Sequence, residues 1–159
     1  MEQQRILTQY KAQMAIQAIR TGDTCLSVEY MPVWGAISLA SAALLGWVLA
    51  LQKMFPSILR DFAKVKAPNR IMQLHLDQVM MGTILLCSST AFPNLPHFVA
   101  QPLTFGCLMN PLGFLPLIFF PSCDKILIYR GGIGISFVSS TIGFVGLAWF
   151  AIQDRILNQ

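Results

Sequence analysis

Charge is what this sequence lacks most. Its 159 residues include 11 Lys and Arg and 7 Asp and Glu, so charged residues make up 11% of the chain. A soluble domain carries about 25% charged residues, because its surface must be solvated. The shortage therefore excludes an ordinary soluble domain and a disordered tail. It also excludes a nucleic-acid-binding module, because the basic residues behind the net charge of +4 are dispersed between apolar stretches.

Motifs for hydrolysis, nucleotide chemistry and zinc binding are also missing. The sequence has no nucleophile elbow, phosphate loop, HExxH motif or paired-carboxylate spacing. Its four cysteines, at positions 25, 87, 107 and 123, show no CxxC spacing, so we expect neither a zinc site nor a redox pair. We expect no signal peptide before the first apolar stretch and expect the first membrane helix to direct insertion.

Long apolar stretches are what the sequence contains. Four of them, at residues 31–52, 71–92, 99–121 and 131–152, match the roughly 20 helical residues that cross a bilayer core. The sequence therefore predicts an all-α integral membrane four-helix bundle over residues 31–159. Residues 1–30 form a separate N-terminal segment, where apolar side chains at helical spacing predict an amphipathic helix. This helix lies on the membrane surface or on a partner, or it is a solvated leader.

Small residues and prolines mark individual spans. In the first span Gly35, Ser38, Ala42 and Gly46 recur at intervals of three and four, and the fourth span is rich in glycine and serine. Small residues at this spacing let helices approach closely within a membrane. Serine hydroxyls of the fourth span are expected to bond to carbonyls of their own helix. Three prolines in the third span predict kinks.

The distribution of Lys and Arg predicts the orientation of the bundle. Loops 53–70 and 122–130 together carry seven of these residues, and the N-terminal segment, the intervening loop and the C-terminus carry four. By the positive-inside rule the two basic loops face the cytoplasm or its equivalent compartment. Both termini then lie on the opposite side.

His75 and Asp77 are the only histidine and the only acid within the predicted spans. An ionisable side chain at the centre of a membrane helix costs about 2.5–3.5 kcal/mol, so it needs a partner or a function. The two residues point to different faces, whereas His75, Gln78 and Gly82 share one face. One interpretation is a planar ligand beside Gly82 with His75 as its metal ligand. The other is a hydrogen-bonded structural histidine near the membrane interface.

Asn110, in the third span, is the second candidate for chemistry. An amide within a bilayer must find hydrogen-bond partners. If the third span is antiparallel to the second, Asn110 approaches the depth of His75 and Asp77 and acts together with them. The alternative is a helix–helix hydrogen bond, which in membranes contributes about 0.6 kcal/mol on average.

The stretch RIMQLHLDQVMMG, residues 70–82, resembles the second helix of the small integral membrane isomerases, the group of hydroxylaminobenzene mutase and styrene oxide isomerase. Gly106 and Asn110 resemble a glycine-to-asparagine stretch in the third helix of those proteins. The resemblance covers residues 31–152 in outline. It implies a trimer-like oligomer with haem b between protomers and His75 as the axial ligand. The sequence departs from the family at Met81, where those enzymes carry an asparagine before the glycine.

Two functions agree best with these features, and a small transporter or a quinone- or pigment-binding protein is the remaining alternative. In the first, the chain is a membrane isomerase that rearranges a small apolar substrate without net redox change. His75 and Gly82 then bind the haem, His75 is the ligand of the iron, and Asp77 and Asn110 are the catalytic residues. In the second, the chain is a non-catalytic structural or accessory subunit of a larger membrane complex. The expected partners are the lipid bilayer and other membrane subunits, and nucleic acid is not expected.

Overall fold

The computed structural model of the chain describes residues 25–57 and 64–154. Their regular elements are all helices: η1 (Val28–Tyr30), α2 (Met31–Met54), α4 (Asn69–Ala91), α5 (His97–Leu112), α6 (Phe114–Phe119), η2 (Pro121–Lys125) and α7 (Leu127–Ile152). The all-α prediction is confirmed for this part of the chain. The amphipathic helix predicted near the N-terminus falls within residues 1–24, outside the described residues.

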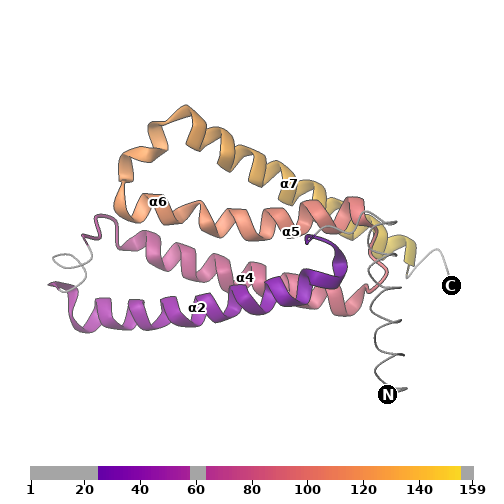
Figure 1. Ribbon diagram of the computed structural model, residues 1–159, viewed down its shortest axis with the longest axis horizontal. Coiled ribbons are helices and arrows are strands. Elements are labelled where there is room, and N and C mark those ends of the chain that lie inside the picture. Colours follow the sequence, from indigo (N-terminus) through magenta and orange to yellow (C-terminus); the bar gives the residue numbers. More distant parts are fainter. Residues whose placement is uncertain (1–24, 58–63, 155–159) are drawn as a thin grey trace, which may run out of the picture.

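Two antiparallel helix pairs make up the fold (Figure 1). α2 packs along α4, α5 packs along α7, and contacts of α4 with α5 and α6 join the two pairs. The short helix α6 continues the direction of α5. Each of the four predicted spans is helical, and the observed bounds differ from the predicted ones by about one helical turn at most.

Three stretches of the described chain are long and apolar enough to cross a membrane: Val28–Met54, His97–Phe119 and Leu127–Ile152. The 26 residues of α7 extend about 39 Å, which exceeds the roughly 30 Å of a hydrocarbon core. α4 has 23 residues and is therefore long enough, but the polar residues of its first half make it less apolar than the other three. Length and composition thus indicate a multi-pass membrane protein.

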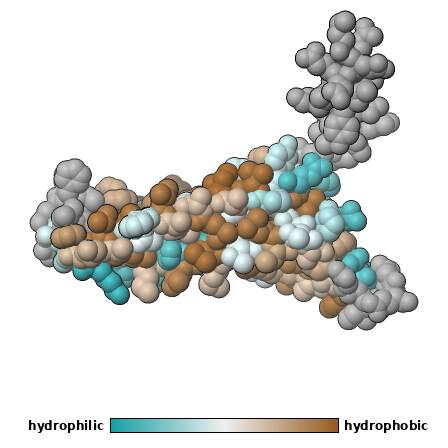
Figure 2. All heavy atoms as spheres, turned by 90° about the horizontal axis from the view of Figure 1, so that it is seen from below, coloured by the Kyte–Doolittle hydropathy of each residue, from teal (hydrophilic) through white to brown (hydrophobic). Residues whose placement is uncertain are grey.

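Apolar side chains cover the outer surfaces of the helices. Trp47 of α2 is 72% exposed and Ile128 of α7 is 87% exposed. On the face shown in Figure 2, hydrophobic residues dominate the middle of the molecule, and hydrophilic residues lie mainly toward its two ends. An apolar surface of this extent is typical of a protein that contacts lipid or other membrane subunits.

The third predicted span is divided into α5 and α6 at Gly113. Pro111 and Pro116 flank this glycine, and a proline has no N–H to donate to the carbonyl four residues earlier. The N–H of Gly113 donates to the carbonyl oxygens of Met109 and Asn110, at 3.0 and 3.2 Å, and closes α5. The prediction that prolines disrupt this span is confirmed at Gly113, between Pro111 and Pro116, whereas Pro102 lies inside the continuous helix α5.

The core lies where the two helix pairs meet. Leu85 of α4 and Leu103 and Cys107 of α5 are fully buried in one cluster. A second cluster, toward the end of the molecule that carries the basic loops, joins Ile71 of α4 to Ile118 of α6. These contacts fix α4 between its neighbours, so the polar side chains of α4 have defined surroundings.

Candidate functional site

The face of α4 that carries His75, Gln78 and Gly82 packs against the small-residue face of α2. A methyl group at Gly82 would lie 3.0 Å from the carbonyl oxygen of Gly35 and 3.1 Å from Cβ of Ser38. The hydroxyl of Ser38 donates to the carbonyl oxygen of Gln78 at 3.2 Å. This corrects the prediction that Gly82 leaves room for a planar ligand, because α2 occupies that space. The glycine permits the close approach of two helices.

His75 is held in place by α2. Its Nδ1 lies 2.8 Å from the carbonyl oxygen of Ala42. Because a carbonyl oxygen only accepts hydrogen bonds, Nδ1 donates this one, and in the neutral imidazole Nε2 carries the lone pair. A methyl group at Gly46 would lie 3.5 Å from Cε1 of the ring, at ordinary contact distance. The ring is therefore oriented by its helix partner, and Nε2 is left for a ligand.

A cavity of about 410 Å³ opens beside His75, between the C-terminal end of α2 and the N-terminal end of α4. We call it the α2–α4 cavity. Its other lining residues are the apolar Leu49, Ala50, Met72 and Leu76, the polar Gln52, Lys53 and Asn69, and Pro68. Sites for small molecules and cofactors range from about 300 to 1,000 Å³ and are mostly apolar with a few polar groups. The α2–α4 cavity therefore has the size and lining of a ligand site.

Asn110 lies on the other side of the bundle, buried between α5 and α7. Its Nδ2 donates to Oγ of Ser140 at 2.8 Å, and its Oδ1 accepts a hydrogen bond from Oγ of Ser136 at 2.6 Å. Oγ of Ser140 donates to the carbonyl oxygen of Ser136 at 3.0 Å. The three side chains satisfy one another. Of the two interpretations of Asn110, the structure therefore shows the helix–helix hydrogen bond.

Two glycines bring α5 and α7 close enough for this network. A methyl group at Gly106 of α5 would lie 2.7 Å from Cα of Ser140. One turn further along the interface, a methyl group at Gly143 of α7 would lie 2.6 Å from the backbone nitrogen of Leu103. Both distances are shorter than any tolerated carbon contact, so the two helices pack backbone against backbone.

Asp77 is half-buried on α4 and has different neighbours from His75. It lies within electrostatic reach of Cys107 on α5. His75 contacts α2 and Asn110 contacts α7, so one chain does not bring the three predicted residues into a single catalytic group. Within residues 25–57 and 64–154, no cluster of three or more His, Cys, Asp or Glu side chains forms a metal site.

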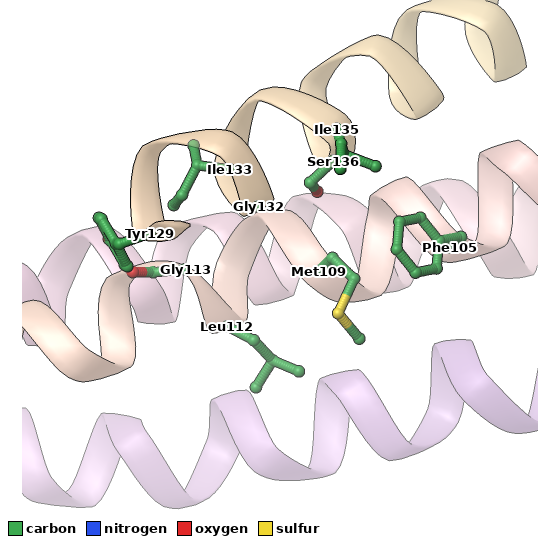
Figure 3. A pocket seen from close by; sticks show the side chains of 9 residues that line it. All are labelled: Phe105, Met109, Leu112, Gly113, Tyr129, Gly132, Ile133, Ile135 and Ser136. Carbon is green, nitrogen blue, oxygen red and sulfur yellow. The ribbon is translucent and has the colours of Figure 1, made fainter. Parts of the chain in front are cut away.

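A second cavity, of about 370 Å³, lies between α5 and α7 near the break at Gly113 (Figure 3). Its walls are almost entirely apolar, with side chains such as Met109 and Ile133. The hydroxyl of Tyr129 lines this cavity and donates to the carbonyl oxygen of Gly113 at 2.5 Å. Ser136, the other hydroxyl of the lining, bonds to the Asn110 amide. The polar groups of this cavity thus serve the packing of α5 against α7.

The hydrogen bonds of Ser136 and Tyr129 between α5 and α7 were not predicted from the sequence. The expected bond of a serine to its own helix is confirmed for Ser140, but Ser136 bonds across the interface to Asn110. A signal was available, because Ser136, Ser140 and Gly143 recur at intervals of four and three and mark one face of the fourth span. Tyr129 falls within the loop 122–130 expected from the sequence, whereas the structure places it in the first turn of α7.

No protein-family model matches the chain, and no curated protein and no solved structure matches it either. The resemblance to the membrane isomerases therefore rests on the residues quoted above.

Proposed function

We propose that the chain is an integral membrane isomerase that rearranges a small apolar substrate without net redox change and binds haem b through His75. The observation that carries the proposal is the hydrogen bond of 2.8 Å between Nδ1 of His75 and the carbonyl oxygen of Ala42. Metal-binding histidines generally donate their second ring N–H to a carbonyl or a carboxylate, which fixes the ring and directs the other nitrogen to the metal. His75 has this partner and also lines the α2–α4 cavity.

The donor and the cavity beside it fit this cofactor. The imidazole supplies a neutral nitrogen ligand, and Leu49, Met72 and Leu76 supply an apolar wall. The cavity lies at the outside of the α2–α4 pair, so a second protomer can cover it, in keeping with the oligomer that the resemblance implies. When bound, haem iron supplies a Lewis acid for the oxygen of an epoxide or a hydroxylamine.

The residues of the chain then orient the ligand and exclude water. The carbonyl of Ala42 holds the imidazole ring, and the apolar side chains keep water away from Nε2. Gly82 acts indirectly, because it lets α2 and α4 approach closely enough for the Ala42 carbonyl to reach His75. Asn110 and Asp77 are left out of the proposed site, since Asn110 is bonded to serines of α7 and Asp77 faces α5.

Four membrane crossings are part of the proposal. α4 is the least apolar of the four helices, but several of its polar side chains are covered by other helices. Gln78 is buried, although its Oε1 has no hydrogen-bond partner, and Nδ1 of His75 is hydrogen-bonded to α2. A polar side chain that is covered by protein costs less in a membrane than one that is exposed to lipid. Both termini then lie on the side opposite the basic loops.

The visible spectrum tests the cofactor. The full chain is expressed with a haem supply and purified in a mild detergent, and we expect a Soret band that His75→Ala abolishes. His97→Ala is the matched control and should keep the band. A colourless wild-type protein, or a band that survives His75→Ala, would overturn the proposal.

A second function, that of a non-catalytic subunit of a membrane complex, is favoured by one observation. The three residues expected to perform chemistry do not form a single catalytic group within one chain. Purification through a tag under mild conditions distinguishes the two functions. A colourless chain recovered in a fixed ratio with other membrane proteins supports the subunit, and a coloured oligomer of this chain alone supports the enzyme.

A further inference from the structure

The α2–α4 cavity changes from polar to apolar with depth. Lys53 and Asn69 lie at the ends of their helices, where the α2–α4 pair opens toward the basic loop. Leu49 and Leu76, farther from these ends by about 6 Å and 10 Å along their helices, line its deeper part. Because α2 and α4 are antiparallel, the C-terminal end of α2 and the N-terminal end of α4 lie together, and the lining of both helices changes from polar to apolar with increasing depth. A ligand that fills the cavity therefore has one polar end and an apolar body.

Lys53 determines the sign of charge at the polar end. The C-terminus of α2 and the N-terminus of α4 meet there, and their partial charges of about −0.5 and +0.5 oppose each other. The ammonium group of Lys53 remains, and Lys53 is the one Lys, Arg, Asp or Glu among the described residues that line the cavity. Arg70, in the first turn of α4, adds a positive charge at the same end of this helix. The polar end of the cavity thus carries the ammonium group of Lys53.

From this polarity we infer that the α2–α4 cavity binds an amphiphilic anion. Its apolar body lies against Leu49, Met72 and Leu76, and its carboxylate or phosphate group meets Lys53. Basic pockets between membrane helices at the cytoplasmic side bind anionic head groups in this way. Two sources share the chemistry, a porphyrin with carboxylate side chains and an anionic phospholipid. The inference deepens the proposed function and rests on it where the anion is haem, because His75 lines the same cavity.

Iron-free protoporphyrin IX tests the inference without any contribution from a His75–iron bond. The full chain is placed in nanodiscs of phosphatidylcholine and titrated with protoporphyrin IX or its dimethyl ester, which lacks the negative charges, and binding is followed by porphyrin fluorescence. We expect the acid to bind about three- to tenfold more tightly than the ester. Lys53→Gln should remove this preference, and Lys53→Arg should retain it.

Lys125→Gln is the matched control, because Lys125 lies in η2 near the same end of the molecule but does not line the cavity. This variant should keep the preference for the acid. Equal binding of acid and ester to the wild-type chain overturns the inference, and so does an equal loss in the Lys53→Gln and Lys125→Gln variants.

Nanodiscs with phosphatidylglycerol identify the source of the anion. If the natural occupant is a phospholipid, phosphatidylglycerol weakens protoporphyrin binding to the wild-type chain but not to Lys53→Gln. If it is a porphyrin, the two lipid compositions give the same affinity. If the protein prefers the acid but shows no Soret band, the proposed function is wrong and the inferred anion site is supported. If the protein shows a Soret band that depends on His75 but binds acid and ester equally, the proposed function is supported and the inferred anion site is wrong.

Discussion

The amide of Asn110 and the hydroxyl of Ser140 are joined by a hydrogen bond of 2.8 Å that crosses from α5 to α7. Ser136 completes the link from the adjacent turn of α7. A polar side chain that the sequence marked for chemistry is therefore part of the packing of two apolar helices. The stability of the α5–α7 pair should depend on it.

Replacing Asn110 with alanine should destabilise the protein by about 1–2 kcal/mol, because two buried hydroxyls lose their side-chain partner. Unfolding in detergent, followed by circular dichroism, measures the change. Thr141→Ala is the control, since Thr141 is exposed and bonds only to the carbonyl of Phe137 on its own helix. Equal effects of the two substitutions would show that the Asn110 network contributes nothing.

The glycines of the α5–α7 interface should tolerate no side chain. Gly106→Ala places a methyl group 2.7 Å from Cα of Ser140, and we expect a loss of about 1–3 kcal/mol as the helices separate. Gly134→Ala, on the same helix pair, meets nothing within 4 Å and should be neutral or slightly stabilising. Thermal unfolding of the two variants gives the comparison. Similar melting temperatures would contradict the close packing of α5 and α7.

A matched pair of glycines tests the α2–α4 contact. Gly82→Ala should destabilise the chain by about 1–3 kcal/mol, because its methyl group meets the backbone of α2 at 3.0 Å. Gly46→Ala should be tolerated, since its methyl group lies 3.5 Å from the His75 ring. Urea-induced unfolding in detergent distinguishes the two. If Gly82→Ala unfolded like the wild type, the space beside Gly82 would be open to a ligand after all.

Tyr129→Phe should weaken the contact between the first turn of α7 and Gly113, where α5 ends. The phenol supplies a donor to the carbonyl of Gly113, and its loss should cost about 1 kcal/mol. Tyr30→Phe makes the same chemical change at an exposed site and should be neutral. Proteolysis of the connection at η2 reports local opening, which we expect to be faster only in Tyr129→Phe. Unchanged cleavage would show that this hydrogen bond does not hold α7.

Chemical labelling of the native cysteines tests whether α4 crosses the membrane. Cys25 precedes α2 and Cys123 lies in η2, at opposite ends of the bundle. With four crossings, a membrane-impermeant maleimide added outside intact cells labels Cys25 but not Cys123 in single-cysteine variants. If α4 did not cross, both cysteines would be on one side and would be labelled alike. Labelling after permeabilisation controls for accessibility.

The helices could be predicted from the sequence because long apolar stretches with few charges have one stable form in a membrane. Their pairing was partly visible as well, since Gly35, Ser38, Ala42 and Gly46 mark the face of α2 that meets α4. The partner of each polar side chain was not visible. Whether Asn110 meets Ser140 or Asp77 depends on helix rotation and depth, and these follow from contacts between residues far apart in the chain.

Gly82 shows the same limit in another way. The spacing from His75 to Gly82 correctly placed both residues on one face of α4, because helical periodicity is local. Which helix covers that face depends on contacts between residues far apart in the chain. A glycine that leaves room for a cofactor and a glycine that admits a neighbouring helix look identical in sequence, and the three-dimensional contact with Gly35 distinguishes them.

The backbones of α5 and α7 are closest near Gly106 and Gly143 and lie farther apart at the start of α7. Around Gly143 and Gly106 the two backbones touch, whereas a methyl group added at Gly131, Gly132 or Gly134, at the start of α7, would meet nothing within 4 Å. In its first two turns α7 is therefore held against the break at Gly113 by the side chains of Tyr129 and Ile133, and not by direct contact of the two backbones.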